Sequence, residues 1–174
     1  LRRRVLGWLL KAALAFVLVS VAMVTLYRFV PPPITLTTMG DIVSGHGVTK
    51  RWVPIERVDP DMARAAIAAE DSGFCTHSGF DYDSIAAAML RNAKGGKVLR
   101  GGSTISQQTA KNVFLWQGGG YFRKGLEAWF TVLNEPNWGK ERTMEVYLNA
   151  RETEAGREAG RERVQVMAGA GHSQ

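Results

Sequence analysis

The chain has 174 residues, of which 45% are hydrophobic and 22% charged, and this ordinary balance allows one globular domain. Its single cysteine, Cys75, excludes an intrachain disulfide. The formal net charge of +6 is unevenly distributed, because residues 1–30 and the stretch from Ser84 to Leu126 contain basic but no acidic residues. An all-basic middle segment indicates an anionic ligand, with phosphate the obvious candidate.

The N-terminal segment predicts a membrane anchor. After Arg2-Arg3-Arg4, the apolar stretch from Val5 to Val30 contains only Lys11 and Arg28 as charged residues and is long enough to cross a bilayer. A cleaved signal peptide is the alternative, but the stretch is long for one and its exit lacks a small-x-small cleavage site. The basic cluster therefore predicts a single-pass inner-membrane protein with a cytoplasmic N-terminus and residues 31–174 in the periplasm.

A proline- and threonine-containing linker is expected over residues 31–49, and a helix from Pro60 to Glu70 with Asp59 as its cap. Because this alanine-rich helix is apolar almost all round, we expect it to be buried. Burial and the negative end of the helix dipole would both raise the pKa of Glu70, which suits a general base near neutral pH. The alternative is a solvated helix end with no chemical role.

Two further helices are predicted around a glycine-rich stretch. Asp83 can cap a helix from Ser84 to about Lys94. The pattern Thr104-x-x-Gln107 is typical of a capping box and predicts another helix start, preceded by glycines. A glycine-rich approach to a helix N-terminus suits an anion, although a capped helix after a flexible turn is the alternative.

The C-terminal third predicts two helices and a tail. The first helix starts at Tyr121 and should end at Pro136, and the second covers Lys140 to Asn149. On the first helix, Arg123, Lys124 and Glu127 share one side, either as a surface ion pair or as a functional carboxylate among phosphate-facing cations. Residues 151–174 alternate Arg and Glu with small residues and lack an apolar stripe, so we expect a solvated, weakly ordered tail.

Four ordered patterns in these segments point to a known family. Residues 70–81 match Glu-Asp-x-x-Phe-x-x-His-x-Gly-Phe-Asp, and residues 101–112 match Gly-Gly-Ser-Thr-Ile-Ser-Gln-Gln-x-x-Lys-Asn. Residues 123–127 match Arg-Lys-x-x-Glu, and residues 140–149 match a fourth motif in which Thr143 replaces an aliphatic residue. Together they resemble the glycosyltransferase domain of the penicillin-binding proteins, in particular its membrane-anchored form, the monofunctional biosynthetic peptidoglycan transglycosylases.

The resemblance is expected to cover a domain at 50–150 and to stop after Asn149, which would make the copy C-terminally truncated or divergent. It implies a mostly α, lysozyme-like fold and an inverting enzyme that polymerises lipid-linked disaccharide-pentapeptide into glycan strands with release of undecaprenyl diphosphate. Glu70 would be the general base and Glu127 a second catalytic carboxylate. The substrate-binding residues implied are Asp71, Ser103, Thr104, Gln107, Gln108, Lys111, Asn112, Arg123 and Lys124.

The same resemblance implies as partners the lipid-linked precursor, the growing glycan strand, the membrane and other cell-wall synthesis proteins, and no nucleic acid. No resident cofactor or metal ligand is predicted, and a divalent cation, Mg²⁺ or Mn²⁺, at the pyrophosphate is the one candidate, with Glu127 as its holder. Two other functions stay open from the residues alone. One is a lysozyme-like hydrolase that uses two carboxylates, and the other is an inactive, membrane-anchored wall-binding or scaffolding protein.

Overall fold

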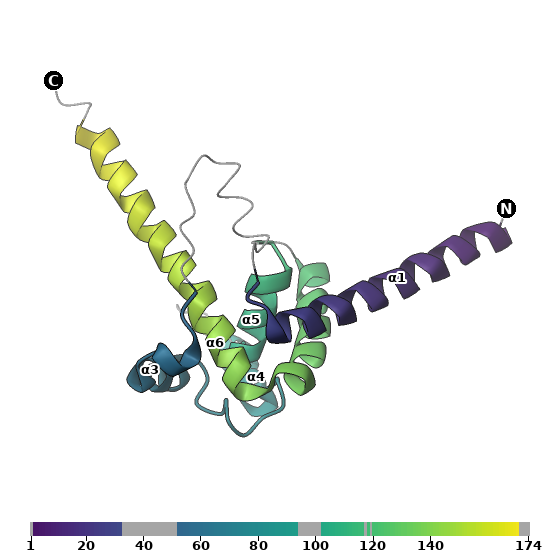
Figure 1. Cartoon of the computed structure of the whole chain (residues 1–174), viewed down its shortest axis with the longest axis horizontal. Helices are drawn as coiled ribbons and strands as arrows, with labels where there is room; N and C mark the ends of the chain where they lie inside the picture. The colour runs from purple at the N-terminus through teal and green to yellow at the C-terminus, as the bar shows by residue number, and fades with distance from the viewer. Residues whose placement is uncertain (1, 33–51, 94–101, 117, 119, 171–174) are drawn as a thin grey trace.

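The computed structural model describes residues 2–32, 52–93, 102–116, 118 and 120–170, and within them the protein is helical with no strand (Figure 1). The prediction of a mostly α fold is therefore confirmed. Its elements are α1 (Arg2–Phe29), the 3₁₀ helix η1 (Ile55–Arg57), α3 (Pro60–Glu70), α4 (Tyr82–Ala93), α5 (Ile105–Phe114) and α6 (Tyr121–Ala170).

Helix α1 is long and apolar enough to cross a membrane. It has 28 residues, and its most apolar window has a mean hydropathy of 2.3 with 11% of that window buried. A core helix of a soluble protein would be mostly buried, whereas this one projects away from the other helices (Figure 1). Among the described residues, the C-terminal half of α1 packs against the other helices: Phe16 lies 5.9 Å from Trp129 between ring centroids, and Val24 is fully buried.

Helix α3 begins and ends where the sequence predicts. Asp59 accepts a hydrogen bond from the backbone N–H of Asp61 at 2.9 Å, and Pro60 is the first helical residue. The prediction that the helix is buried is wrong, since none of its residues is buried and Glu70 is exposed. Its alanine side chains are small, and only a stripe that includes Ile67 packs against a neighbouring apolar cluster.

Helix α4 begins at Tyr82, two residues earlier than expected, and Asp81 rather than Asp83 caps it. The carboxylate of Asp81 accepts from the Ser84 backbone N–H at 2.8 Å and from the Ser84 hydroxyl at 2.6 Å. The hydroxyl bond and then the backbone bond from Ser84 hold the pKa of Asp81 below its usual range. Asp81 is the cap because it stands three residues before Ser84, which is the spacing from a cap to the third helical N–H. The predicted end at Lys94 lies outside the described residues.

The capping box at α5 is confirmed in both directions. The Gln107 backbone N–H donates to the Thr104 hydroxyl at 3.2 Å, and the Gln107 side chain accepts from the Thr104 backbone N–H at 3.0 Å. Most of α5 is buried, and Ala110, Val113 and Phe114 belong to the main apolar cluster. Helix α5 is therefore the buried central helix of the described structure.

Helix α6 does not end at Pro136, as the sequence predicted, but bends at Gly139. Pro136 and Val132, whose carbonyl loses its intrahelical donor to the proline, are both exposed, so water can satisfy that carbonyl. Gly139 has φ of 68°, a left-handed conformation that glycine adopts without a steric penalty. Beyond the bend the backbone stays helical to Ala170, where the sequence predicted a weakly ordered tail.

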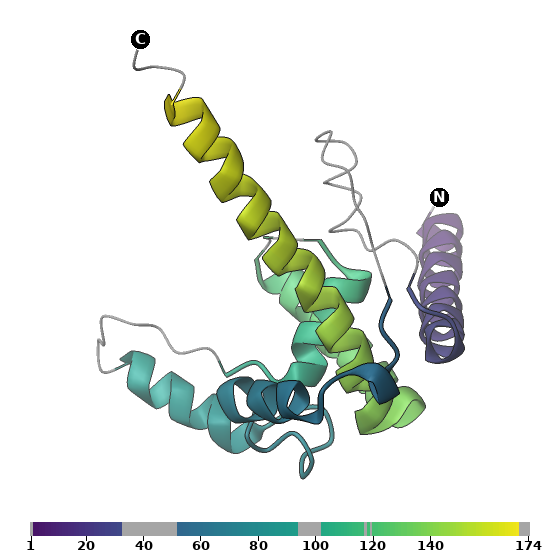
Figure 2. The ribbon, with the colours of Figure 1, turned by 60° about the vertical axis from the view of Figure 1, so that its left-hand side comes forward.

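The helices are arranged so that α3 and α1 lie on opposite sides of α6 (Figures 1 and 2). One apolar cluster joins α1, α5 and α6, with Phe114 stacked on Phe130 at a centroid distance of 4.4 Å. A second cluster joins Phe74, which follows α3, to Ile105 and Tyr147. The second cluster fixes the loop after Glu70 and the start of α5 next to each other.

Candidate active site

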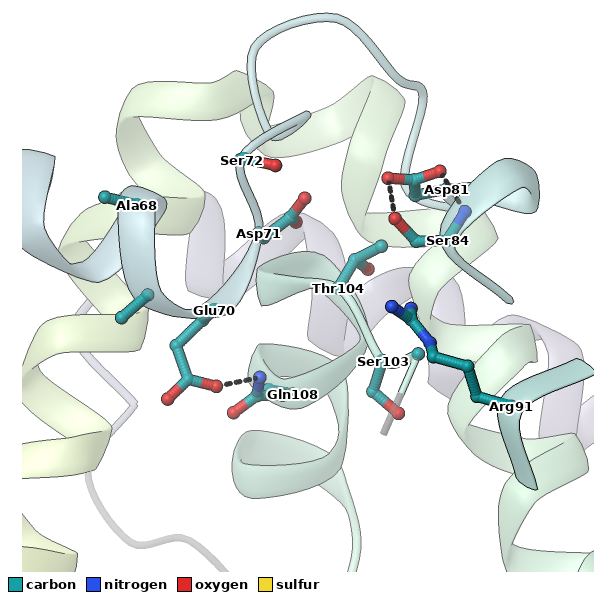
Figure 3. A pocket seen from close by; sticks show the side chains of 12 residues that line it. Ala68, Glu70, Asp71, Ser72, Asp81, Ser84, Arg91, Ser103, Thr104 and Gln108 are labelled. Atoms are coloured by element: carbon teal, nitrogen blue, oxygen red, sulfur yellow. Dashed lines mark hydrogen bonds between the residues drawn. The ribbon is translucent and has the colours of Figure 1, made fainter. Parts of the chain in front are cut away.

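A pocket of about 380 Å³ opens where the end of α3, the start of α5 and one face of α4 meet (Figure 3). Most of its side chains are polar. Its lining residues are Ala68, Ala69, Glu70, Asp71, Ser72, Asp81, Ser84, Arg91, Gly102, Ser103, Thr104 and Gln108.

Glu70 stands at one side of this pocket as the last residue of α3. Its Oε2 accepts a hydrogen bond from the Gln108 side-chain amide at 3.0 Å (Figure 3). The carboxylate is exposed, so the burial on which its predicted pKa rise depended is missing. Of the two features on which that prediction rested, only the position of Glu70 at the negative end of α3 is present.

Asp71 next to it is 6% exposed and fully engaged by the protein. Both of its oxygens lie 2.9 Å from His77 Nε2, and Oδ2 also accepts the Ile105 backbone N–H at 2.9 Å. Because His77 Nδ1 accepts the Gly79 backbone N–H at 3.1 Å, the hydrogen-bond pattern assigns the ring proton to Nε2, facing Asp71. Asp71 thus ties the loop after Glu70 to the N-terminus of α5.

A cluster of charges lies beside the pocket on the first turns of α6. The Glu127 side chain is 3% exposed, and its carboxylate accepts from Arg123 Nη1 at 2.9 Å and is paired with Lys124 Nζ. Lys124 Nζ also donates to the Ser103 hydroxyl at 3.0 Å, and Ser103 lines the pocket. The Lys124 side chain is 46% exposed, so this cation reaches both the pocket wall and solvent.

The structure brings five of the predicted site residues to the pocket wall, namely Glu70, Asp71, Ser103, Thr104 and Gln108. The other six lie behind or beside it. Gln107 is the buried capping side chain and Lys111 is half-buried on α5. Asn112 is 3% exposed, and its Oδ1 has no hydrogen-bond partner among the described residues. The functional roles of all these residues stay predictions.

Sequence reasoning did not include Arg91 among the site residues, although α4 brings it to the pocket. Its side chain lies across the pocket from Glu70, with Ser103 and Thr104 between them (Figure 3). The only available signal was the excess of basic residues in the middle of the chain. The pocket therefore has a carboxylate on one side and a cation on the other.

The predicted divalent cation finds no ready site in the part of the chain that the structure describes. No group of three His, Cys, Asp or Glu side chains there lies close enough to hold a metal. Glu127, the expected holder, has its two oxygens paired with Arg123 and Lys124. The divalent cation at the pyrophosphate stays a prediction.

Comparison with known proteins identifies the family of this chain. The family model described as Transglycosylase matches residues 37–163, a range wider at both ends than the predicted domain at 50–150. The chain is 52%, 50% and 46% identical to the biosynthetic peptidoglycan transglycosylases of Caulobacter vibrioides, Bdellovibrio bacteriovorus and Xanthomonas oryzae pv. oryzae, respectively. These alignments cover 89%, 82% and 87% of this chain and 67%, 59% and 64% of the respective relative.

The chain therefore spans about three-fifths to two-thirds of the length of these curated relatives. The family model covers more than half of the chain, and the sequence is 52% identical to the Caulobacter protein, which together establish the family. The chain belongs to the transglycosylase family.

Proposed function

We propose that this protein is a peptidoglycan glycosyltransferase, which joins lipid-linked disaccharide-pentapeptide units into glycan strands for the cell wall. The observation that carries the proposal is the placement of Glu70 in a polar pocket whose wall is contacted by Lys124. The names of the relatives support the same reaction class.

In this reaction Glu70 takes the proton from the 4-hydroxyl of the acceptor sugar. The oxygen forms a bond to the anomeric carbon of the donor while the bond from that carbon to the pyrophosphate oxygen breaks, with inversion. The Gln108 amide holds the Glu70 carboxylate in the pocket through its 3.0 Å hydrogen bond. A positioned general base of this kind contributes about 10²–10⁴-fold to the rate.

The leaving pyrophosphate carries the negative charge that develops in the transition state. Cations held in place before the reaction stabilise such charge most effectively. Lys124 is positioned by Glu127 and Ser103, and Arg91 also lines the pocket. We assign the pyrophosphate to the space between these two cations.

A hydrolase of the lysozyme type would need a second carboxylate that is available to the substrate. The other two carboxylates of the pocket are already occupied by donors of the protein itself. Asp71 binds His77 and the α5 N-terminus, and Asp81 caps α4. The pocket therefore favours transfer to a sugar acceptor over hydrolysis.

The direct test is to incubate the purified protein, reconstituted in liposomes, with lipid-linked disaccharide-pentapeptide. We expect glycan strands and released undecaprenyl diphosphate, because the pocket combines a base with cations. Shortening of preformed strands would instead indicate a hydrolase, and binding without either reaction would indicate a scaffold. Either of these two results contradicts the proposal.

The substrate and the anchor together suggest the location. We propose that α1 holds the protein in the inner membrane with the N-terminus in the cytoplasm and the pocket in the periplasm, because Arg2, Arg3 and Arg4 precede the apolar helix. Alkaline phosphatase fused after Thr49 should then be active. An inactive fusion, together with an active cytoplasmic reporter at the same position, would reverse this orientation.

A further inference from the structure

The part of α6 just after its bend contacts two regions that are far apart in sequence. Lys140 Nζ donates to the His77 carbonyl at 2.6 Å and lies 4.6 Å from the centroid of the Phe74 ring, so it holds the loop that follows Glu70. Arg142 reaches the end of α1. Residues two apart on a helix project from nearly opposite faces, so one turn of α6 contacts the catalytic loop and the anchor at once.

Arg142 binds the C-terminal end of α1 through its backbone carbonyls. Its Nε and Nη2 donate to the Tyr27 carbonyl at 3.2 and 2.8 Å, and Nη2 also donates to the Val30 carbonyl at 3.1 Å. The last carbonyls of a helix have no intrahelical donor, and a cation is favoured at that negative end. Arg142 therefore supplies the donors and the charge that this helix end lacks.

The guanidinium is itself held in place from two further sides. Its Nη1 lies 3.1 Å from Glu145 Oε2, and it stacks over the Trp52 ring at 5.2 Å. Trp52 Nε1 donates to the other oxygen of Glu145 at 2.8 Å, which closes the arrangement. Because the Arg142 side chain is only 14% exposed, these contacts leave it little freedom to move.

Apolar contacts add a second attachment between the same elements. Trp138, just before the bend, donates its Nε1 to the Val24 carbonyl at 2.8 Å. Tyr27 stacks on Phe114 of α5 at a centroid distance of 5.8 Å. Apolar packing of this kind favours association, whereas directional bonds select one orientation of α1, and Arg142 supplies three of them beside the one from Trp138.

We propose that Arg142 is a positioning residue that locks the end of α1 to the catalytic domain in one orientation. For an enzyme whose substrate stays in the bilayer, this lock would set the height and tilt of the pocket relative to the membrane. That consequence rests on the proposed function, whereas the lock itself does not. Without it, motion between the two parts is the default expectation.

The lock can be measured as a distance between two spin labels in liposomes. Cys75 is the only cysteine of the chain and is exposed, so it accepts one label, and Leu18→Cys on an exposed face of α1 accepts the other. We expect a single narrow distance distribution in the labelled protein. Arg142→Gln should replace it with a broad one, and so should Arg142→Lys, because lysine keeps the charge but lacks the planar fork of donors.

Arg64→Gln is the matched control, because Arg64 is an arginine with a side chain that is 76% exposed and pairs only with Asp61 among the contacts described for it. It should leave the narrow distribution unchanged.

If Arg142→Gln does not fold, as judged by circular dichroism, Trp52→Phe provides the test. That variant keeps the ring under the guanidinium and removes the donor to Glu145, and it should broaden the distribution to a smaller extent.

An Arg142→Gln protein that folds and keeps the narrow distribution would overturn the proposal. If Arg142→Gln fails to fold, a folded Trp52→Phe protein with an unchanged distribution width would overturn it instead.

An activity readout then separates positioning from chemistry. Arg142→Gln should lose rate with lipid-embedded substrate but keep it with a short-chain, water-soluble analogue. Equal loss with both substrates contradicts a positioning role, while no activity in any variant speaks against the proposed function and leaves the distance result standing.

Discussion

Replacement of Glu70 by glutamine is expected to lower the polymerisation rate by about 10²–10⁴-fold, the usual contribution of a positioned general base. The amide has the shape of the carboxylate but cannot take the proton of the acceptor hydroxyl. Because Glu70 is exposed and none of the residues of α3 is buried, the fold should tolerate the change. The rate is measured with lipid-linked disaccharide in liposomes, and the fold by circular dichroism.

Two variants make this result specific. Glu56→Gln changes another exposed carboxylate outside the pocket and should keep the full rate. Gln108→Ala removes the 3.0 Å bond that orients Glu70 but leaves the base in place, so its loss of rate should be smaller than that of Glu70→Gln. A Glu70→Gln protein with near-normal turnover would show that another group takes the proton.

The starts of α3 and α5 could be predicted from the sequence, because capping depends on residues only a few positions apart. Asp59 before Pro60, and the pair Thr104 and Gln107, each satisfy backbone donors within one turn. The prediction of Asp83 as the α4 cap was wrong, because the helix begins two residues earlier than expected and Asp81 accepts from the Ser84 backbone N–H and hydroxyl.

Features that depend on distant contacts could not be predicted. The exposure of α3 follows from how much of it the cluster around Phe74 covers, and the bend of α6 occurs at Gly139 instead of the more obvious Pro136. Arg91 reaches the pocket because α4 approaches the α5 start so closely that a Cβ on Gly102 would lie 3.0 Å from the Ile85 Cα. No local pattern around Arg91 reports that approach.

The family motifs were more informative about the site than periodicity or composition. They identified Glu70, Ser103 and Gln108, which come together although 38 positions separate Glu70 from Gln108. They did not separate residues that face the pocket from residues that support it. Gln107 and Glu127 belong to the second group, as their burial and their bonds to Thr104, Arg123 and Lys124 show.

Glu127→Gln is expected to reduce both stability and activity, because this carboxylate holds two cations in place from a buried position. Its side chain is 3% exposed, and its carboxylate is paired with Arg123 and Lys124. Hydrogen bonds to charged groups contribute about 1.5–3 kcal/mol, so we expect the free energy of unfolding to fall by about that amount. A small domain with a margin of about 5–15 kcal/mol should still fold.

The loss of activity has a separate cause in the same variant. The described partners of Lys124 Nζ are Glu127 and the Ser103 hydroxyl. Without the Glu127 carboxylate, the Ser103 hydroxyl alone of these two holds Nζ beside the pocket. A misplacement of about 1 Å can lower a rate roughly 10²-fold, so we expect a loss of that order at a temperature where the variant is fully folded. Glu141→Gln, an exposed glutamate on the same helix, is the matched control and should change neither property.

A double variant separates the two effects of Glu127. Arg123 has a side chain that is 16% exposed, so Glu127→Gln leaves a largely buried cation without its partner. Replacing Arg123 by glutamine as well removes that uncompensated charge, so the double variant should recover part of the lost stability in urea unfolding. It should not recover the polymerisation rate, because Lys124 still lacks the carboxylate that positions it. Recovery of the rate together with the stability would mean that Glu127 acts only through folding, and that Lys124 needs no fixed position for catalysis.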